Sequence, residues 1–168
     1  SYRSSFLGID VLGLETVGDL PPLRNVISYL RNHFYDLSIH ASEQIDEQGL
    51  RDALNLEPNA LSHLTRAAKN DELLSQVADK GIFVEICTTS NYLVLPAVIQ
   101  KHGYHPLQDF AQFKSGKGNR LQLCLGSDDP TSFGNTIQDE YQEANKLGLT
   151  TQRINEAAKQ RLDSLYNP

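Results

Sequence analysis

The stretch Glu72–Asn91, with the sequence ELLSQVADKGIFVEICTTSN, contains one complete unit of the predicted fold. In its first part, Glu72–Lys80, apolar residues recur at helical spacing, and Gly81 follows as a helix stop. The apolar run Ile82–Cys87 then predicts a buried strand, and a polar run, Thr88–Asn91, begins where that strand ends. A helix that leads into a buried strand is typical of the β-α units of parallel sheets.

The same alternation continues over the rest of the chain. Strand-like runs occur at Phe6–Leu12, Leu37–His40, Ala60–Leu64, Ile82–Cys87 and Leu121–Gly126. Helical spacing predicts helices over Leu23–Phe34, Gln44–Leu54, Glu72–Lys80, Pro96–Lys101, Ile137–Leu147 and Ile154–Leu165. Five β-α units with right-handed crossovers make a single α/β domain over residues 1–168. They fit either a flavodoxin-like open sheet or the larger part of an eight-stranded barrel, and periodicity does not choose between the two.

The composition is that of an ordinary folded domain, with 39% hydrophobic and 21% charged residues. A net charge of −6 disfavours binding to nucleic acid or to an anionic membrane, because both need clustered Lys and Arg. No apolar run approaches the ~20 residues of a transmembrane helix. Cys87 and Cys124 are isolated in apolar runs, so we expect buried, reduced thiols and a cytoplasmic protein. The chain contains no methionine, and we expect an excerpt of a longer polypeptide rather than a processed product.

Chemically active side chains follow three of the predicted strands, at the carboxyl ends where parallel α/β folds carry their chemistry. His40 and Glu43 follow the second strand, His63 the third, and Asp128 and Asp129 the fifth. Imidazole and carboxylate are ligands of a catalytic zinc ion, which keeps one position open for water and lowers the pKa of that water to ~7. These residues predict a hydrolytic zinc site, with Glu43 placed as a general acid and one aspartate on the metal while the other holds substrate.

Each of these residues also has a purely structural interpretation. A single histidine at a strand end is commonly a hydrogen-bonded core or rim residue, and Asp128-Asp129-Pro130 is compatible with a turn or helix cap. Glu43 is compatible with a solvated first helical turn. Two histidines at successive strand ends, joined by an aspartate pair at another, favour a site. The chain has no Gly-x-Ser-x-Gly elbow, Cys-x-x-Cys pair or P-loop that would indicate other chemistry.

Taken in order, these motifs resemble those of the adenosine and AMP deaminase family over essentially the whole chain. The segments that carry the resemblance are Gly8–Glu15, His40–Glu43, His63, Val84–Asn91, His105-Pro106, Ser127–Phe133 and Asp139–Tyr141. The resemblance implies a (β/α)8 TIM barrel with one zinc ion at its mouth. The chain would supply the C-terminal five β-α units of that barrel, and the first strands would be absent from this sequence.

The resemblance also implies a role for each candidate residue. His40 and Asp128 would be zinc ligands. Glu43 would protonate the purine ring at N1, and His63 would orient or deprotonate the attacking water. The implied reaction is hydrolytic deamination at C6, which converts adenine to hypoxanthine and releases ammonia.

Two further residues would contact the substrate by the same resemblance. Asp129 would form a hydrogen bond with N7 of the purine, and the backbone N–H of Gly13 would reach N3. Adenosine is the first substrate expected, and AMP or a higher adenine nucleotide is the close alternative. The competing hypothesis is a non-catalytic, deaminase-like module that acts in binding or assembly.

The chain departs from the family pattern at its metal ligands. The family's first strand carries a His-x-His pair that supplies two more zinc ligands, and this sequence has no His-x-His. We therefore expect an N-terminal barrel segment, in the same polypeptide or an associated chain of an oligomer, that supplies this pair and covers the open strand edges. The family also usually has Gly at position 42 and on both sides of His63, and Pro at position 88. Here these positions hold Ser42, Ser62, Leu64 and Thr88, so we expect a pocket of different shape.

Overall fold

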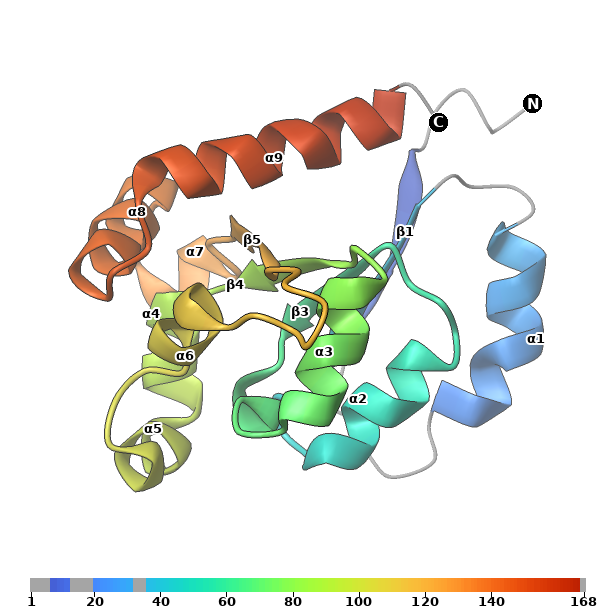
Figure 1. The fold of residues 1–168 in the computed structure, drawn as a ribbon, viewed down its shortest axis with the longest axis horizontal. Helices are drawn as coiled ribbons and strands as arrows, with labels where there is room; N and C mark the ends of the chain where they lie inside the picture. The colour runs from blue at the N-terminus through green and yellow to red at the C-terminus, as the bar shows by residue number, and fades with distance from the viewer. Residues whose placement is uncertain (1–6, 13–19, 32–35, 167–168) are drawn as a thin grey trace.

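The computed structural model describes residues 7–12, 20–31 and 36–166. The described strands form one parallel sheet in the order β1-β2-β3-β4-β5 (Figure 1). They are β1 (Gly8–Val11), β2 (Asp36–Ala41), β3 (Ala60–His63), β4 (Phe83–Ile86) and β5 (Gln122–Leu125). Each strand pairs with the next strand in the chain, whereas a flavodoxin-like sheet reverses its order at a switch point. The sequential order therefore identifies the other predicted fold, five β-α units of a (β/α)8 barrel.

Helices connect the strands and follow the last one. They are α1 (Leu20–Arg31), α2 (Glu47–Leu54), α3 (Asp71–Asp79), α4 (Thr88–Val94), α5 (Pro96–His102), α6 (Leu107–Gln112), α7 (Pro130–Phe133), α8 (Ile137–Lys146), α9 (Thr151–Tyr166) and the short 3-10 helix η2 (Thr65–Ala67). Figure 1 shows α1, α2 and α3 together on one side of the sheet, while α9 runs along its other side near β4 and β5. No described helix is both long and apolar enough to cross a lipid bilayer.

The two faces of β2 differ in polarity because successive side chains of a strand point to opposite faces. Leu37, Ile39 and Ala41 are fully buried and belong to the main hydrophobic core. By the same alternation, Asp36 and His40 lie on the opposite face, which is the interior face of a barrel. Helices α2 and α3 thus pack on the apolar face, and the polar face is the one that carries the candidate site.

The first two strands approach closely at Gly8, which is opposite Asp36 in the parallel register. A Cβ atom on Gly8 would lie only 2.6 Å from the Cβ atom of Asp36. Any larger residue would push β1 away from β2. Gly8 therefore allows β1 to pair closely with β2. This pairing also fixes the position of Asp10, which lies two residues further along β1.

All five predicted strands and all six predicted helices are present, with ends shifted by a few residues. The predicted boundaries Phe6 and Phe34 lie outside the described residues. The short helices α4, α6, α7 and η2 are additional, because their sequences have no clear helical period and depend on contacts elsewhere in the fold. Cys87 and Cys124 are buried, free thiols, as predicted.

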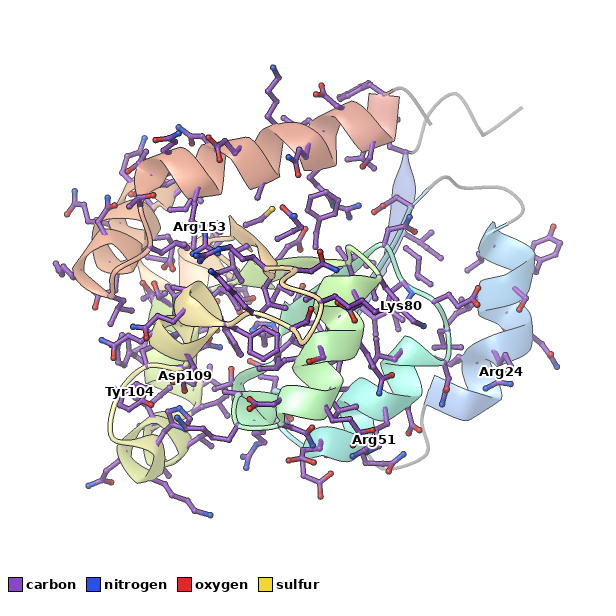
Figure 2. All side chains as sticks on the ribbon, in the orientation of Figure 1. Arg24, Arg51, Lys80, Tyr104, Asp109 and Arg153 are labelled. Carbon is purple, nitrogen blue, oxygen red and sulfur yellow. The ribbon has the colours of Figure 1, made fainter. Side chains whose placement is uncertain are left out.

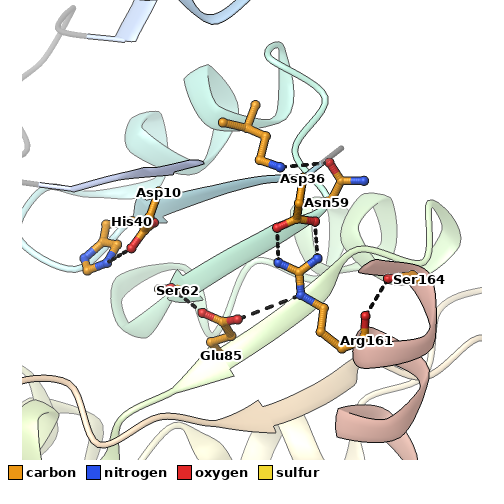
Figure 3. A network of polar contacts seen from close by, with 9 residues as sticks. Asp10, Asp36, His40, Asn59, Ser62, Glu85, Arg161 and Ser164 are labelled. Carbon is orange, nitrogen blue, oxygen red and sulfur yellow. Dashed lines mark hydrogen bonds and ion pairs between the residues drawn. The ribbon is translucent and has the colours of Figure 1, made fainter. Parts of the chain in front are cut away.

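A buried ion pair joins the last helix to the second strand (Figure 3). The guanidinium of Arg161 in α9 donates from two nitrogens to the two carboxylate oxygens of Asp36, and these side chains are only 10% and 9% exposed. The Nε atom of Arg161 also lies 4.0 Å from Oε1 of Glu85, which accepts a hydrogen bond from Ser62 Oγ at 3.2 Å through its other oxygen. Residues from α9, β2, β3 and β4 are thereby connected on the polar face of the sheet.

Replacing Arg161 by Met should lower the free energy of unfolding of the full-length protein by about 3–5 kcal/mol, because the buried Asp36 carboxylate would lose its partner. The matched control is Arg51→Met on α2. The Arg51 side chain is 41% exposed and 4.0 Å from Glu47, and such a surface pair contributes about 0.3–0.5 kcal/mol (Figure 2). Urea unfolding of both variants measures the difference. Equal losses would show that the Arg161–Asp36 pair does not stabilise the sheet.

Candidate active site

Two of the predicted site residues meet at the carboxyl edge of the sheet. His40 is the fifth residue of β2, and His63 is the last residue of β3. The register pairs His40 with Ser62 and Ala41 with His63, so the two histidines stand one position apart on neighbouring strands, and His63 has a φ of 72° rather than a strand value. Their ring centroids are 4.8 Å apart, and His63 Nε2 lies 3.2 Å from His40 Nδ1, within hydrogen-bonding distance.

Glu43 lies against the same histidine pair. Its Oε1 atom is 3.7 Å from His63 Nδ1. The two residues are 8% and 1% exposed, so both are largely withdrawn from solvent. The structure therefore brings His40, Glu43 and His63 together as the sequence predicts, with the carboxyl group in a buried setting rather than on a solvated helical turn.

The backbone around these residues is strained. Ser42, His63, Leu64 and Asp128 have φ angles of 52°, 72°, 54° and 56°, in the left-handed region that costs a non-glycine residue about 1–2 kcal/mol. Ser42 and Leu64 are two of the positions where the family pattern has Gly. Strain of this kind is concentrated at functional sites, where the surrounding structure must hold it in place.

Hydrogen bonds around Ser42 hold that strained turn. Its Oγ atom donates to Asp46 O at 2.8 Å and accepts from the backbone N–H of Leu50 at 3.2 Å. Its carbonyl oxygen accepts from the backbone N–H of Arg66 at 2.9 Å. The Arg66 Nε atom also donates to the carbonyl oxygen of Glu43 at 2.8 Å. The serine side chain thus supplies contacts that a glycine at position 42 would lack.

Two residues of the cluster had no role in the sequence prediction. Asn91 in α4 is 1% exposed, and its Nδ2 atom lies 3.3 Å from His63 Nδ1. Asp10 in β1 lies 3.5 Å, Oδ2 to Nε2, from His40 (Figure 3). When the Asn91 amide donates to Nδ1 of His63, Nε2 of His63 can donate to Nδ1 of His40, and Nε2 of His40 can donate to Asp10. The alternation of β1 is the signal that could have placed Asp10 on the site face.

The two histidines differ in their electrostatic surroundings. The hydrogen bond with Asp10 raises the pKa of His40 above 6.5, and the same contact lowers the pKa of Asp10. Burial, together with the neighbouring charge of His40, lowers the pKa of His63 to about 4. His63 is therefore neutral at neutral pH, which is the form that can accept a proton.

The predicted metal ligands fall into two overlapping groups. Donor atoms of His40, Glu43 and His63 lie within 4.8 Å of one another, and so do those of His63, Cys87 and Asp128. His63 belongs to both groups, whereas the two predicted ligands, His40 and Asp128, each belong to a different one. Burial raises the pKa of the Cys87 thiol, which disfavours the thiolate form that binds metal. The imidazole and carboxylate donors are thus the better ligands of the described cluster.

Of the remaining predicted site residues, two are exposed to solvent and one lies outside the described residues. Asp128 and Asp129 are exposed, and Asp129 occupies the N-cap of α7 without a side-chain capping bond. The Asp-Asp-Pro segment is therefore the start of a short helix, as its structural interpretation suggests, but the Asp129 carboxylate does not cap it. Gly13 lies outside the described residues, so the structure does not test its predicted contact.

The other two described histidines of interest face different partners. His102 Nε2 lies 2.8 Å from Asp109 Oδ2, and its ring centroid is 4.9 Å from that of Tyr104. Nδ1 of His105 accepts from the backbone N–H of Leu107 at 3.1 Å. The two histidines thus have separate partners and do not form a shared metal site.

Comparison with known sequences identifies relatives of this chain. A sequence model of the protein family described as adenosine deaminase matches residues 4–168. An adenine deaminase of Rhizobium meliloti is 27% identical over 161 residues, which are 95% of this chain and 47% of the relative. An adenosine deaminase of Plasmodium falciparum is 30% identical over 146 residues, 84% of this chain and 37% of the relative. The chain spans less than half the length of these relatives.

Solved structures give the same picture of the fold. The N6-methyl-AMP deaminase from Arabidopsis thaliana superposes with a TM-score of 0.73 at 24% identity, covering 94% of this chain and 44% of that protein. An adenine deaminase from Arthrobacter aurescens superposes with a TM-score of 0.68 at 21% identity, covering 84% and 41%. The five β-α units therefore correspond to part of a larger barrel.

The opposite pKa shifts predict an order of protonation in the metal-free, full-length protein. His40 should take up a proton above pH 6.5, whereas His63 should stay neutral until about pH 4. As the pH falls from 6.5 towards 4, His63 then reduces stability, because the unfolded chain binds its proton first. The raised pKa of His40 acts in the opposite direction, since the folded state gains that proton first.

Ring chemical shifts followed by NMR during a pH titration measure both steps. Asp10→Asn is the control, because it should lower the pKa of His40 by removing the carboxylate partner. Protonation of His63 before His40 would contradict the predicted order.

Proposed function

Because this chain belongs to the adenosine deaminase family, we propose that its full-length protein hydrolytically deaminates an adenine compound at C6 and releases ammonia. The observation that carries the proposal is the buried contact of His40, Glu43 and His63 at the carboxyl edge of the sheet, with Asp128 beside His63. A base that is neutral at pH 7 and a buried carboxylic group are the acid-base pair that such a reaction needs. A module that only binds or assembles has no physical need for this cluster.

The donor set fits a zinc ion. His40 would supply imidazole nitrogen and Asp128 carboxylate oxygen, both of which zinc accepts in catalytic sites. The bound ion would act as a Lewis acid and make hydroxide available near neutral pH. Two protein ligands are fewer than the three that a catalytic zinc usually has, so this chain's residues would hold zinc together with ligands from elsewhere.

The buried residues would carry out the proton transfers. Glu43, which is 8% exposed, would donate a proton to N1 of the purine and make C6 more electrophilic. His63, which its lowered pKa keeps neutral at pH 7, would orient the attacking water and accept its proton. Asp129 would hold N7 and the Gly13 N–H would hold N3, which fixes the ring relative to Glu43.

The proposed substrate is an adenine nucleoside or nucleotide, with adenosine first. The relatives named above comprise deaminases of adenine, of adenosine and of N6-methyl-AMP. An Arabidopsis protein of the same fold, named ADAL, has been solved in complex with GMP and with IMP, so a member of this fold accommodates purine nucleotides. Adenine, adenosine and AMP are therefore the three compounds that an assay should compare.

A further part of the proposal concerns the rest of the barrel. In the described sheet, β1 and β5 each pair with a single strand and so present open edges. Large apolar side chains are exposed on the helices beside those edges: Val26 and Tyr29 on α1 are 54% and 64% exposed, and Leu162 on α9 is 53% exposed. A segment that adds the remaining strands, in the same polypeptide or an associated chain, would cover both edges and bring the His-x-His ligands.

Closure of the barrel should protect the edge strands. In the full-length protein, backbone amides of β1 and β5 that lack partners in the described sheet should exchange with solvent as slowly as those of β3. Hydrogen exchange measured by mass spectrometry on the isolated residues 1–168 and on the full-length protein provides the comparison. Fast exchange at both edges in the full-length protein would contradict closure.

Replacing Glu43 by Gln tests the chemistry, because Gln cannot deliver the proton. The variant should lose about 10²–10⁴-fold in kcat while its zinc content stays unchanged. Loss of adenine absorbance measures turnover, and elemental analysis measures zinc. The control is Glu72→Gln, the same substitution at an exposed position of α3, which should retain full activity.

Two outcomes would overturn the assignments. Loss of zinc in Glu43→Gln would mean that Glu43 is a ligand rather than the acid. Failure of the zinc-loaded, full-length protein to convert adenine, adenosine or AMP would exclude the proposed reaction.

A further inference from the structure

Glu140 in α8 is fully buried, although its side chain lies outside the proposed catalytic cluster. A buried carboxylate is unfavourable unless hydrogen-bond donors surround it. Four donors do so here. The backbone N–H and the hydroxyl of Thr88 and the backbone N–H of Thr89 donate to it, the first at 2.6 Å and the last at 3.2 Å, and Asn135 Nδ2 donates at 2.8 Å.

The first three of these donors belong to the start of α4. The N-cap residue of that helix, Cys87, makes no side-chain capping bond. The first N–H groups of a helix need an acceptor, and a carboxylate also interacts favourably with the positive end of the helix. Glu140 therefore caps α4 from another helix, 52 residues away in sequence.

The capped helix carries Asn91, one turn further along. Asn91 is 1% exposed and its Nδ2 atom is 3.3 Å from His63 Nδ1. The position of this amide depends on where α4 begins, because the helix is only seven residues long. Glu140 thus acts on His63 through α4 and Asn91.

The fourth donor connects Glu140 to a second strand end. Asn135 Nδ2 donates at the same time to the carbonyl oxygen of Ser127 at 3.0 Å. Ser127 immediately precedes Asp128, whose backbone is in the left-handed region at a φ of 56°. A strained turn needs such external contacts to persist. Glu140 thus also acts on Asp128, through Asn135.

We propose that Glu140 is a positioning residue that ties the ends of β4 and β5 together, orienting His63 through Asn91 and placing Asp128 through Asn135. This inference rests on the proposed function for its effect on turnover, but not for its effect on the two site residues. All four surrounding groups are donors, so a carboxylate satisfies them. A glutamine at this position would direct its own NH2 group at one of them.

The test compares Glu140→Gln with Glu143→Gln in the zinc-loaded, full-length protein. Glu143 is on the same helix and pairs with Lys146 at 3.0 Å, so the control has the same chemical change away from the strand ends. Glu140→Gln should lower kcat and weaken zinc binding by about 10–100-fold each, the range found for residues that orient metal ligands. It should also shift the ring nitrogen resonances of His63 in the metal-free protein at constant pH. Glu143→Gln should change none of these.

Two milder variants separate the connection through α4 to His63 (the α4 arm) from the connection through Asn135 to Asp128. They also remain useful where Glu140→Gln does not fold. Thr88→Val keeps the shape of the side chain and removes one donor of the α4 arm, so it should shift the His63 resonances. Asn135→Ala breaks the bridge to Ser127, so it should weaken zinc binding and leave the His63 resonances in place.

The outcomes distinguish positioning from general stability. If the Glu140, Thr88 and Asn135 variants lower the melting temperature but leave His63 resonances and zinc affinity unchanged, Glu140 is only structural and the proposal is wrong. If the wild-type protein deaminates no adenine compound, the proposed function fails, while resonances and zinc affinity still decide the role of Glu140.

Discussion

The parallel pairing of β1 to β5 in chain order is the constraint on which the rest of the structure depends. It directs the carboxyl end of every strand to one edge, so residues far apart in sequence become neighbours there. The pairing of β2 with β3 brings the ends of these two strands together, and there His40 and His63 lie within 3.2 Å although 23 positions separate them in the sequence. The alternation of each strand then divides the sheet into an apolar face under α2 and α3 and a polar face that carries the site.

Burying charged groups at the sheet and at its strand ends costs free energy, and specific hydrogen bonds and ion pairs offset that cost. Asp36 is matched by Arg161, and Glu85 lies beside that arginine and accepts from Ser62. Glu140 is surrounded by donors from α4 and Asn135. Burial nevertheless raises the pKa of Glu85 and lowers that of His63. The same low-polarity surroundings that make these groups costly give His63 the neutral form that acid-base chemistry requires.

Much of the fold and part of the site could be predicted from the sequence. Periodicity located the five strands, and the positions of His40, Glu43 and His63 at strand ends indicated a cluster that the structure brings together. The left-handed backbone at Ser42, Leu64 and Asp128 was not predicted, although the glycine that the family pattern has at positions 42 and 64 was a signal for it. The helix α4 was also missed, since its N-terminus depends on a carboxylate 52 residues further along the chain.

The sequence by itself determined which elements form, which strand faces are apolar, and which imidazole and carboxylate groups stand at strand ends. These are local properties, set by the spacing of side chains along the chain. Periodicity left an open sheet and a barrel both possible, the family resemblance implied the barrel, and the tertiary structure confirmed it through the order of strand pairing. The tertiary structure alone placed Asp10 on His40 and Asn91 on His63, and it gave the two histidines opposite pKa shifts. Those outcomes depend on distances between distant residues and on burial, which exist only after the chain has folded.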